Sequence, residues 1–123
     1  MLAAWIVVAV LALLAVFQIA LALGAPWGAF AWGGQTKVLP TSLRVGSAGA
    51  VLLYAVIAVV VLDRAGEIDM LSDGVAAASA WVVFGFAALS VLVNAVSRSK
   101  PERYTMTPLC VVFAVASFVV ATG

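Results

Sequence analysis

Histidine is absent from this chain of 123 residues, and there is only one cysteine, Cys110. A lone thiol cannot form an internal disulfide, and without histidine it lacks the usual partner for zinc binding or for activation as a nucleophile. Charged residues make up only 9% of the chain, and we expect no acidic residue inside a membrane span. The sequence therefore predicts no catalytic, cofactor-binding or metal-binding residues, and it argues against an enzyme.

Basic residues are also few, and the formal net charge is only +1. The strongly basic surface that is typical of nucleic-acid binding is therefore excluded, and we predict no nucleic-acid partner.

Apolar residues dominate instead, at 67% of the chain, and nearly all the charges fall in three gaps between long apolar runs. A helix of about 20 apolar residues crosses the ~30 Å hydrocarbon core of a bilayer, and it satisfies its own backbone hydrogen bonds in lipid. The sequence thus predicts an all-α polytopic membrane protein, with four transmembrane helices in a compact bundle that forms one membrane domain over residues 1–123. The predicted helices cover about 2–23, 43–62, 75–96 and 100–122, with connections at 24–42, 63–74 and 97–99.

The start of the fourth helix is set by a capping signal. Its uninterrupted apolar run, from Leu109 to Ala121, has only about 13 residues, which is too short to cross a bilayer at ~1.5 Å per residue. Ser99 and Glu102 fit a capping box, in which the serine caps the helix and the glutamate side chain reaches back to the serine N–H. We therefore predict that the helix begins near Lys100.

Orientation follows from the distribution of lysine and arginine, which remain on the cytoplasmic side of a membrane. The second connection carries only Arg64, together with four acids that we expect to be solvated rather than to form a weak cation site. We therefore predict that both termini lie outside and that the first and third connections are cytoplasmic. These two connections carry Lys37, Arg44, Arg98, Lys100 and Arg103, whereas the acids of the second are Asp63, Glu67, Asp69 and Asp73.

The first connection is rich in aromatic residues and glycine, which is unusual for a solvent-exposed loop. Trp27, Phe30 and Trp32 are side chains of the kind that prefer the headgroup layer, so they predict an interfacial aromatic loop that anchors the first two helices. The alternative is a re-entrant or lid-like segment over a pocket on the cytoplasmic side, since the glycines allow the backbone to turn or move.

Polar side chains within the spans are few, and they are expensive in hydrocarbon unless they find partners. Most of them fall in the half of the bundle that we predict to be cytoplasmic. We interpret them as the lining of a polar pocket or as interhelical contacts, worth roughly 0.6 to 2 kcal/mol each. They are Gln18, Arg44, Tyr54, Ser90 and Asn94.

Several short motifs occur at the helix ends and connections. They are Gly24-Ala25-Pro26-Trp27-Gly28, Gly33-Gly34, Val38-Leu39-Pro40, Arg44, Asn94, Ser97 to Lys100, Glu102-Arg103 and Pro108. In these motifs the chain resembles a family of short bacterial four-helix integral membrane proteins that carries no established activity. The resemblance implies the same architecture and a place in the bacterial cytoplasmic (inner) membrane, without implying a mechanism.

Two classes of function stay open at this level. The first is a non-catalytic bundle that lies in the lipid bilayer and binds a lipid or a membrane-protein partner. The second is a small transporter or channel with a polar pocket facing the cytoplasm, which requires a homo-oligomer because four helices with so few polar side chains enclose little aqueous space.

Overall fold

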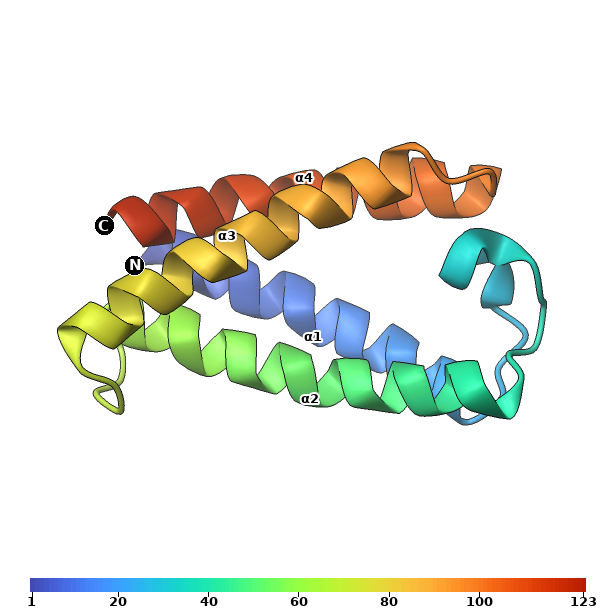
Figure 1. The fold of residues 1–123 in the computed structure, drawn as a ribbon, viewed down its shortest axis with the longest axis horizontal. Coiled ribbons are helices and arrows are strands. Elements are labelled where there is room, and N and C mark those ends of the chain that lie inside the picture. The colour runs from blue at the N-terminus through green and yellow to red at the C-terminus, as the bar shows by residue number, and fades with distance from the viewer.

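The computed structural model describes residues 1–123 and contains four α-helices and no strands. Helix α1 spans Leu2–Ala22, α2 spans Thr41–Arg64, α3 spans Asp73–Ala95 and α4 spans Lys100–Thr122 (Figure 1). Two short 3₁₀ turns, η1 (Gly28–Phe30) and η2 (Trp32–Gly34), lie in the first connection. The predicted all-α class with four packed helices is confirmed.

The surface of the bundle is apolar along its length. Each helix includes an 18-residue window with a mean hydropathy between 2.0 and 2.7, yet at most 33% of any such window is buried inside the bundle. Bulky side chains therefore point outward, including Val16, Leu52 and Val82, which are 67%, 72% and 72% exposed. Such a continuous apolar surface is unfavourable in water and is suited to lipid. The chain is a multi-pass membrane protein.

The helices pack as two close pairs. Helix α3 lies along α4 and α1 along α2, while α1 and α4 join the pairs (Figure 1). Helix α3 contributes small residues to the helix contacts, among them Ala80 and Ala87, which are 2% and 0% exposed. Their small side chains allow the neighbouring helices to approach closely. Helices α2 and α3 are close at one end of the bundle and diverge towards the other (Figure 1).

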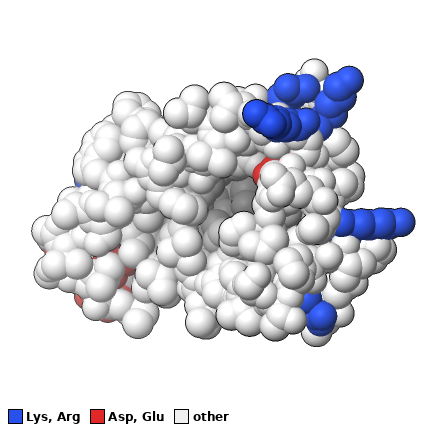
Figure 2. Space-filling view, turned by 45° about the vertical axis from the view of Figure 1, so that its right-hand side comes forward, with Lys and Arg blue, Asp and Glu red and all other residues white.

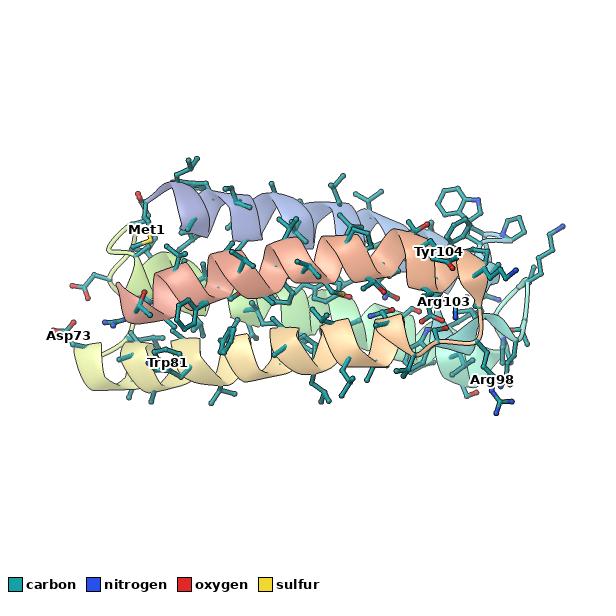
Figure 3. The ribbon with its side chains drawn as sticks, turned by 90° about the horizontal axis from the view of Figure 1, so that it is seen from above. Met1, Asp73, Trp81, Arg98, Arg103 and Tyr104 are labelled. Atoms are coloured by element: carbon teal, nitrogen blue, oxygen red, sulfur yellow. The ribbon has the colours of Figure 1, made fainter.

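The two ends of the bundle carry opposite charges. Both termini and the α2–α3 connection lie at one end, and the other two connections lie at the opposite end (Figure 1). Figure 3 places Met1 and Asp73 at the first end and Arg98 and Arg103 at the second. We name these the acidic end, which holds Asp63, Glu67, Asp69 and Asp73, and the basic end, which holds Lys37, Arg44, Arg98, Lys100 and Arg103.

Asp63, in the last turn of α2, corrects the expectation that all four acids of the predicted connection 63–74 are solvated. Its side chain is buried, with 9% exposed. Its Oδ2 accepts hydrogen bonds from the backbone N–H groups of Met70 and Leu71, at 2.6 and 2.7 Å. The carboxylate satisfies two donors that the turn leaves free, so it holds the connection against the end of α2.

Two further contacts close the acidic end. The Met1 amino group donates to Glu67 Oε1 at 2.6 Å, which is the one ion pair in the structure. This hydrogen bond, together with the charge of the amine, holds the pKa of the exposed Glu67 carboxyl below its ordinary value. Arg64 Nη2 donates to the carbonyl oxygen of Ala121 at 3.0 Å, so the end of α2 is joined to the end of α4.

Candidate functional site: a pocket in the basic half of the bundle

A pocket of about 250 Å³ lies between the four helices and the first connection. Figure 2 shows a hollow on this face, with an acidic residue at its edge and lysines and arginines beyond it. Fifteen residues line the pocket, and eleven of them are hydrophobic. They are Leu14, Phe17 and Gln18 of α1, Phe30, Ala31 and Trp32 of the first connection, Ala50 and Tyr54 of α2, Phe86, Ser90 and Asn94 of α3, and Glu102, Met106, Cys110 and Phe113 of α4.

The pocket lies where α2 and α3 diverge. The buried residues of α3 end at Ala87, so the last two turns of this helix contribute no core residue. In α2, Ser47 is the only buried residue before Ile57. The first connection and the larger side chains of α1 and α4 partly occupy this space, which leaves a cavity rather than a packed core.

Gln18 and Tyr54 form the polar contact between α1 and α2 inside the pocket. Gln18 Nε2 donates to the Tyr54 hydroxyl oxygen at 3.5 Å, the long limit for a hydrogen bond. Gln18 Oε1 is buried and has no hydrogen-bond partner in the protein. One end of this amide is therefore free to bond to a molecule in the pocket.

Asn94 and Ser90 lie on the α3 side of the pocket. Asn94 Nδ2 donates to the Ser90 carbonyl oxygen at 2.8 Å and to Cys110 Sγ at 3.4 Å, so Asn94 bridges α3 and α4. The Ser90 hydroxyl donates to the Phe86 carbonyl oxygen at 2.9 Å, within its own helix. Asn94 thus combines an interhelical contact with a place in the pocket lining, whereas Ser90 only lines the pocket.

Arg44 lies apart from the other four polar residues that we singled out in the spans. Its Nε donates to the Ala22 carbonyl oxygen at 2.9 Å, at the last residue of α1. The guanidinium packs close to Gly24, where a β-carbon would lie 3.6 Å from it. A cation at the C-terminus of a helix is favourable, so Arg44 joins α2 to the end of α1 and does not line the pocket.

Glu102 corrects the expectation that no acidic residue lies inside the bundle. It is only 7% exposed and lines the pocket from the first turn of α4. Ser99 caps α4 as predicted, since its hydroxyl oxygen accepts from the Glu102 N–H at 3.4 Å. The glutamate side chain does not complete the capping box, because its Oε2 instead accepts from the Ser97 hydroxyl at 2.7 Å.

A signal for the burial of Glu102 was present in the sequence. Glu102, Met106, Cys110 and Phe113 are spaced by four, four and three residues, which places them on one face of a helix. All four are buried and all four line the pocket. The prediction of a capping box assigned Glu102 to the start of the helix and not to this buried face.

The aromatic side chains of the first connection have separate positions. Trp27 stacks on Phe17 of α1, with ring centroids 6.4 Å apart and planes 3° from parallel, and it stays 47% exposed. Phe30 and Trp32 line the pocket. The Trp32 indole N–H donates to the hydroxyl oxygen of Ser47, which is fully buried, at 3.0 Å. The connection is therefore both an aromatic surface and a wall of the pocket.

The backbone of this connection is closely packed against its surroundings. Trp32, Gly33 and Gly34 have φ angles of 52°, 79° and 71°, so three successive residues adopt a left-handed conformation. The Ser99 hydroxyl donates to the Ala29 carbonyl oxygen and so joins the connection to α4. A β-carbon at Gly34 would overlap Ser99, and one at Gly46 would lie 3.0 Å from the Trp32 ring. Glycine at both positions allows this docking.

Comparison of the chain with known protein families, with curated proteins and with solved structures finds no match. The pocket itself therefore carries the functional argument. It combines aromatic walls with a few polar groups from separate helices, an arrangement that is typical of binding sites for small molecules. The chain brings no group of three or more histidine, cysteine, aspartate or glutamate residues together.

Proposed function

We propose that this is a non-catalytic membrane protein that binds an amphipathic molecule, a lipid or a lipid-like compound, in the pocket of its basic half. The observation that carries the proposal is the cavity of about 250 Å³, which all four helices line. Interiors of folded proteins rarely leave such a space empty. Its polar groups are few, and they occur beside aromatic walls that suit an apolar chain.

The distribution of charge supports a proposal for the membrane and the orientation of the protein. Five of the six basic residues lie at one end of the bundle, and we propose that this end faces the cytoplasm of a bacterial inner membrane. The helix-end motifs favour membership of the bacterial four-helix family that the chain resembles. Cationic side chains at the basic end also favour anionic headgroups near the mouth of the pocket.

Filling the pocket tests the proposal. Ala50 lines the pocket and has room beside it, so Ala50→Phe places a ring in the cavity. The matched control is Ala55→Phe, five residues further along the same helix at an exposed, lipid-facing position. Native mass spectrometry from a mild detergent is expected to show a bound ligand in the wild type and the control, and none in Ala50→Phe. Equal retention in all three proteins would contradict the proposal.

A second candidate function is the oligomeric transporter or channel, which the polar lining of the pocket favours. Gln18, Asn94 and Glu102 come from three helices and meet at one cavity, and such groups mark ion and solute pathways in membrane proteins. Flux measurements in proteoliposomes distinguish the candidates. We expect no flux of small ions or cationic solutes, and a selective flux that Ala50→Phe abolishes would favour the transporter.

A further inference from the structure

We infer that the ligand of the pocket is an organic cation, with an ammonium group at the Glu102 carboxylate and an apolar part among the aromatic side chains. This inference rests on the proposed function, which requires a ligand but leaves its charge open.

The first observation is a buried carboxylate without a cation. Glu102 is 7% exposed, and the only side chain that donates to its carboxylate is Ser97. The one ion pair in the structure lies at the opposite end of the bundle. A carboxylate taken out of water is unfavourable unless a positive charge or several donors compensate it. A ligand with an ammonium group supplies both.

The nearby basic residues do not compensate the charge of the Glu102 carboxylate. Arg98 and Lys100 are exposed, and the Arg103 guanidinium lies over the Tyr104 ring, 4.9 Å from its centroid. Figure 3 shows Arg98 at the outer end of the bundle. Since none of the three forms an ion pair with Glu102, the carboxylate is left for a guest molecule.

The second observation concerns the walls. Six of the twelve aromatic residues of the chain line this one pocket: Phe17, Phe30, Trp32, Tyr54, Phe86 and Phe113. Aromatic faces attract ammonium groups through their negative electrostatic potential and also bury apolar chains. A pocket for an anion would need free N–H donors or basic side chains in its lining, and the lining contains no lysine or arginine. The side-chain N–H groups of Gln18, Trp32 and Asn94 already donate within the protein.

The third observation is the size of the cavity. At about 250 Å³ the pocket lies just below the ~300 to 1,000 Å³ of sites for drug-sized ligands, so it suits a smaller molecule. A small primary amine with a ring or a short chain fills it. The ammonium headgroup of an aminophospholipid also fits, provided that the rest of the lipid extends through the mouth. The two sources share the same chemistry at Glu102.

A matched pair of probes tests the inference. Benzylamine and benzyl alcohol have the same number of non-hydrogen atoms and differ in charge at neutral pH. Calorimetric titration of the purified protein in a non-ionic detergent is expected to show at least tenfold tighter binding of benzylamine. Glu102→Gln keeps the shape of the side chain and is expected to remove this preference, whereas the control Glu67→Gln, at the acidic end, is expected to keep it.

The outcomes separate the inference from the function on which it rests. Equal binding of the two probes to the wild type, or binding of neither, would overturn the inference. A neutral or anionic ligand retained in native mass spectrometry and lost in Ala50→Phe would overturn it too, while leaving the proposed function in place. If the inference holds, retention of phosphatidylethanolamine over phosphatidylglycerol, lost in Glu102→Gln, identifies a lipid headgroup. Tight benzylamine binding without a retained aminophospholipid identifies a free amine.

Discussion

The acidic and basic halves of the bundle are built from the same four helices, yet one half is packed and the other is hollow. In the acidic half, small and apolar side chains such as Val7, Ala80 and Val120 are at most 2% exposed and belong to the hydrophobic core. In the basic half, aromatic and polar side chains surround a space of about 250 Å³. The contrast teaches that the packed half provides the stability of the fold, and the open half is available for binding.

The same enlargement should have opposite effects in the two halves. Ala80→Phe forces a ring into a site that is 2% exposed, and overpacking of this kind costs up to about 3 kcal/mol. Ala50→Phe places the same ring in the pocket and is expected to change the free energy of unfolding little. Unfolding in detergent by increasing sodium dodecyl sulfate measures both. A comparable loss of stability in both variants would show that the pocket is packed as tightly as the core.

The two buried carboxylates should also respond differently to removal. Asp63→Ala leaves the N–H groups of Met70 and Leu71 without their acceptor, so we expect a loss of about 2 kcal/mol in the free energy of unfolding. Glu102→Gln, in ligand-free protein, is expected to leave stability unchanged or to increase it, because its carboxylate has no compensating cation. The same detergent unfolding titration applies, and a larger loss for Glu102→Gln than for Asp63→Ala would contradict the comparison.

Loss of the Trp32 indole N–H should loosen the wall of the pocket without unfolding the bundle. Trp32→Phe keeps a ring in place but leaves the buried Ser47 hydroxyl without its partner, which costs about 1 kcal/mol. Hydrogen exchange is expected to become faster over residues 27–36 and to stay unchanged in α4. Trp81→Phe is the control, because Trp81 is 45% exposed and its indole N–H, unlike that of Trp32, donates to no group of the protein. Unchanged exchange in Trp32→Phe would exclude this role for the indole.

The smallest effect is expected at the exposed Glu67. The pKa of Glu67 is lowered in the folded protein. The bond to the Met1 amine therefore contributes fully to the free energy of unfolding when the pH is above the ordinary carboxyl pKa of 4.5. This contribution is lost as the pH falls through the lowered value. A carboxyl titration followed by NMR is expected to show this shift. Because the Glu67 side chain is exposed, Glu67→Gln should change the free energy of unfolding only slightly. An ordinary pKa for Glu67 would show that the contact does not persist in solution.

The sequence was sufficient to predict the four helices because each apolar run satisfies its own backbone in lipid. The start of α4 was also accessible, since the Ser99 cap depends on residues only three apart. Gln18, Tyr54, Ser90 and Asn94 were singled out from the sequence, either as the lining of a pocket or as interhelical contacts, because polar groups are conspicuous in apolar spans. All four line the pocket in the structure.

Contacts that depend on the relative positions of distant segments were not accessible in this way. Arg44 bonds to the end of α1, and this requires the register of α1 against α2. The helical spacing marks the Glu102 face of α4 as buried, but the contact of Glu102 with Ser97 requires the path of the α3–α4 connection. The cavity beside Glu102 requires the divergence of α2 and α3, which no local pattern specifies. The turn that Asp63 closes likewise depends on how residues 65–72 fold back.

Cys110 is the only thiol of the chain, it is 6% exposed, and it lies in the pocket lining. We therefore expect a molecule bound in the pocket to slow the reaction of Cys110 with an alkylating reagent or a spin label. The wild-type protein thus carries its own occupancy reporter. The rate of thiol modification can then be used to measure whether the pocket is occupied, with no cysteine introduced or removed.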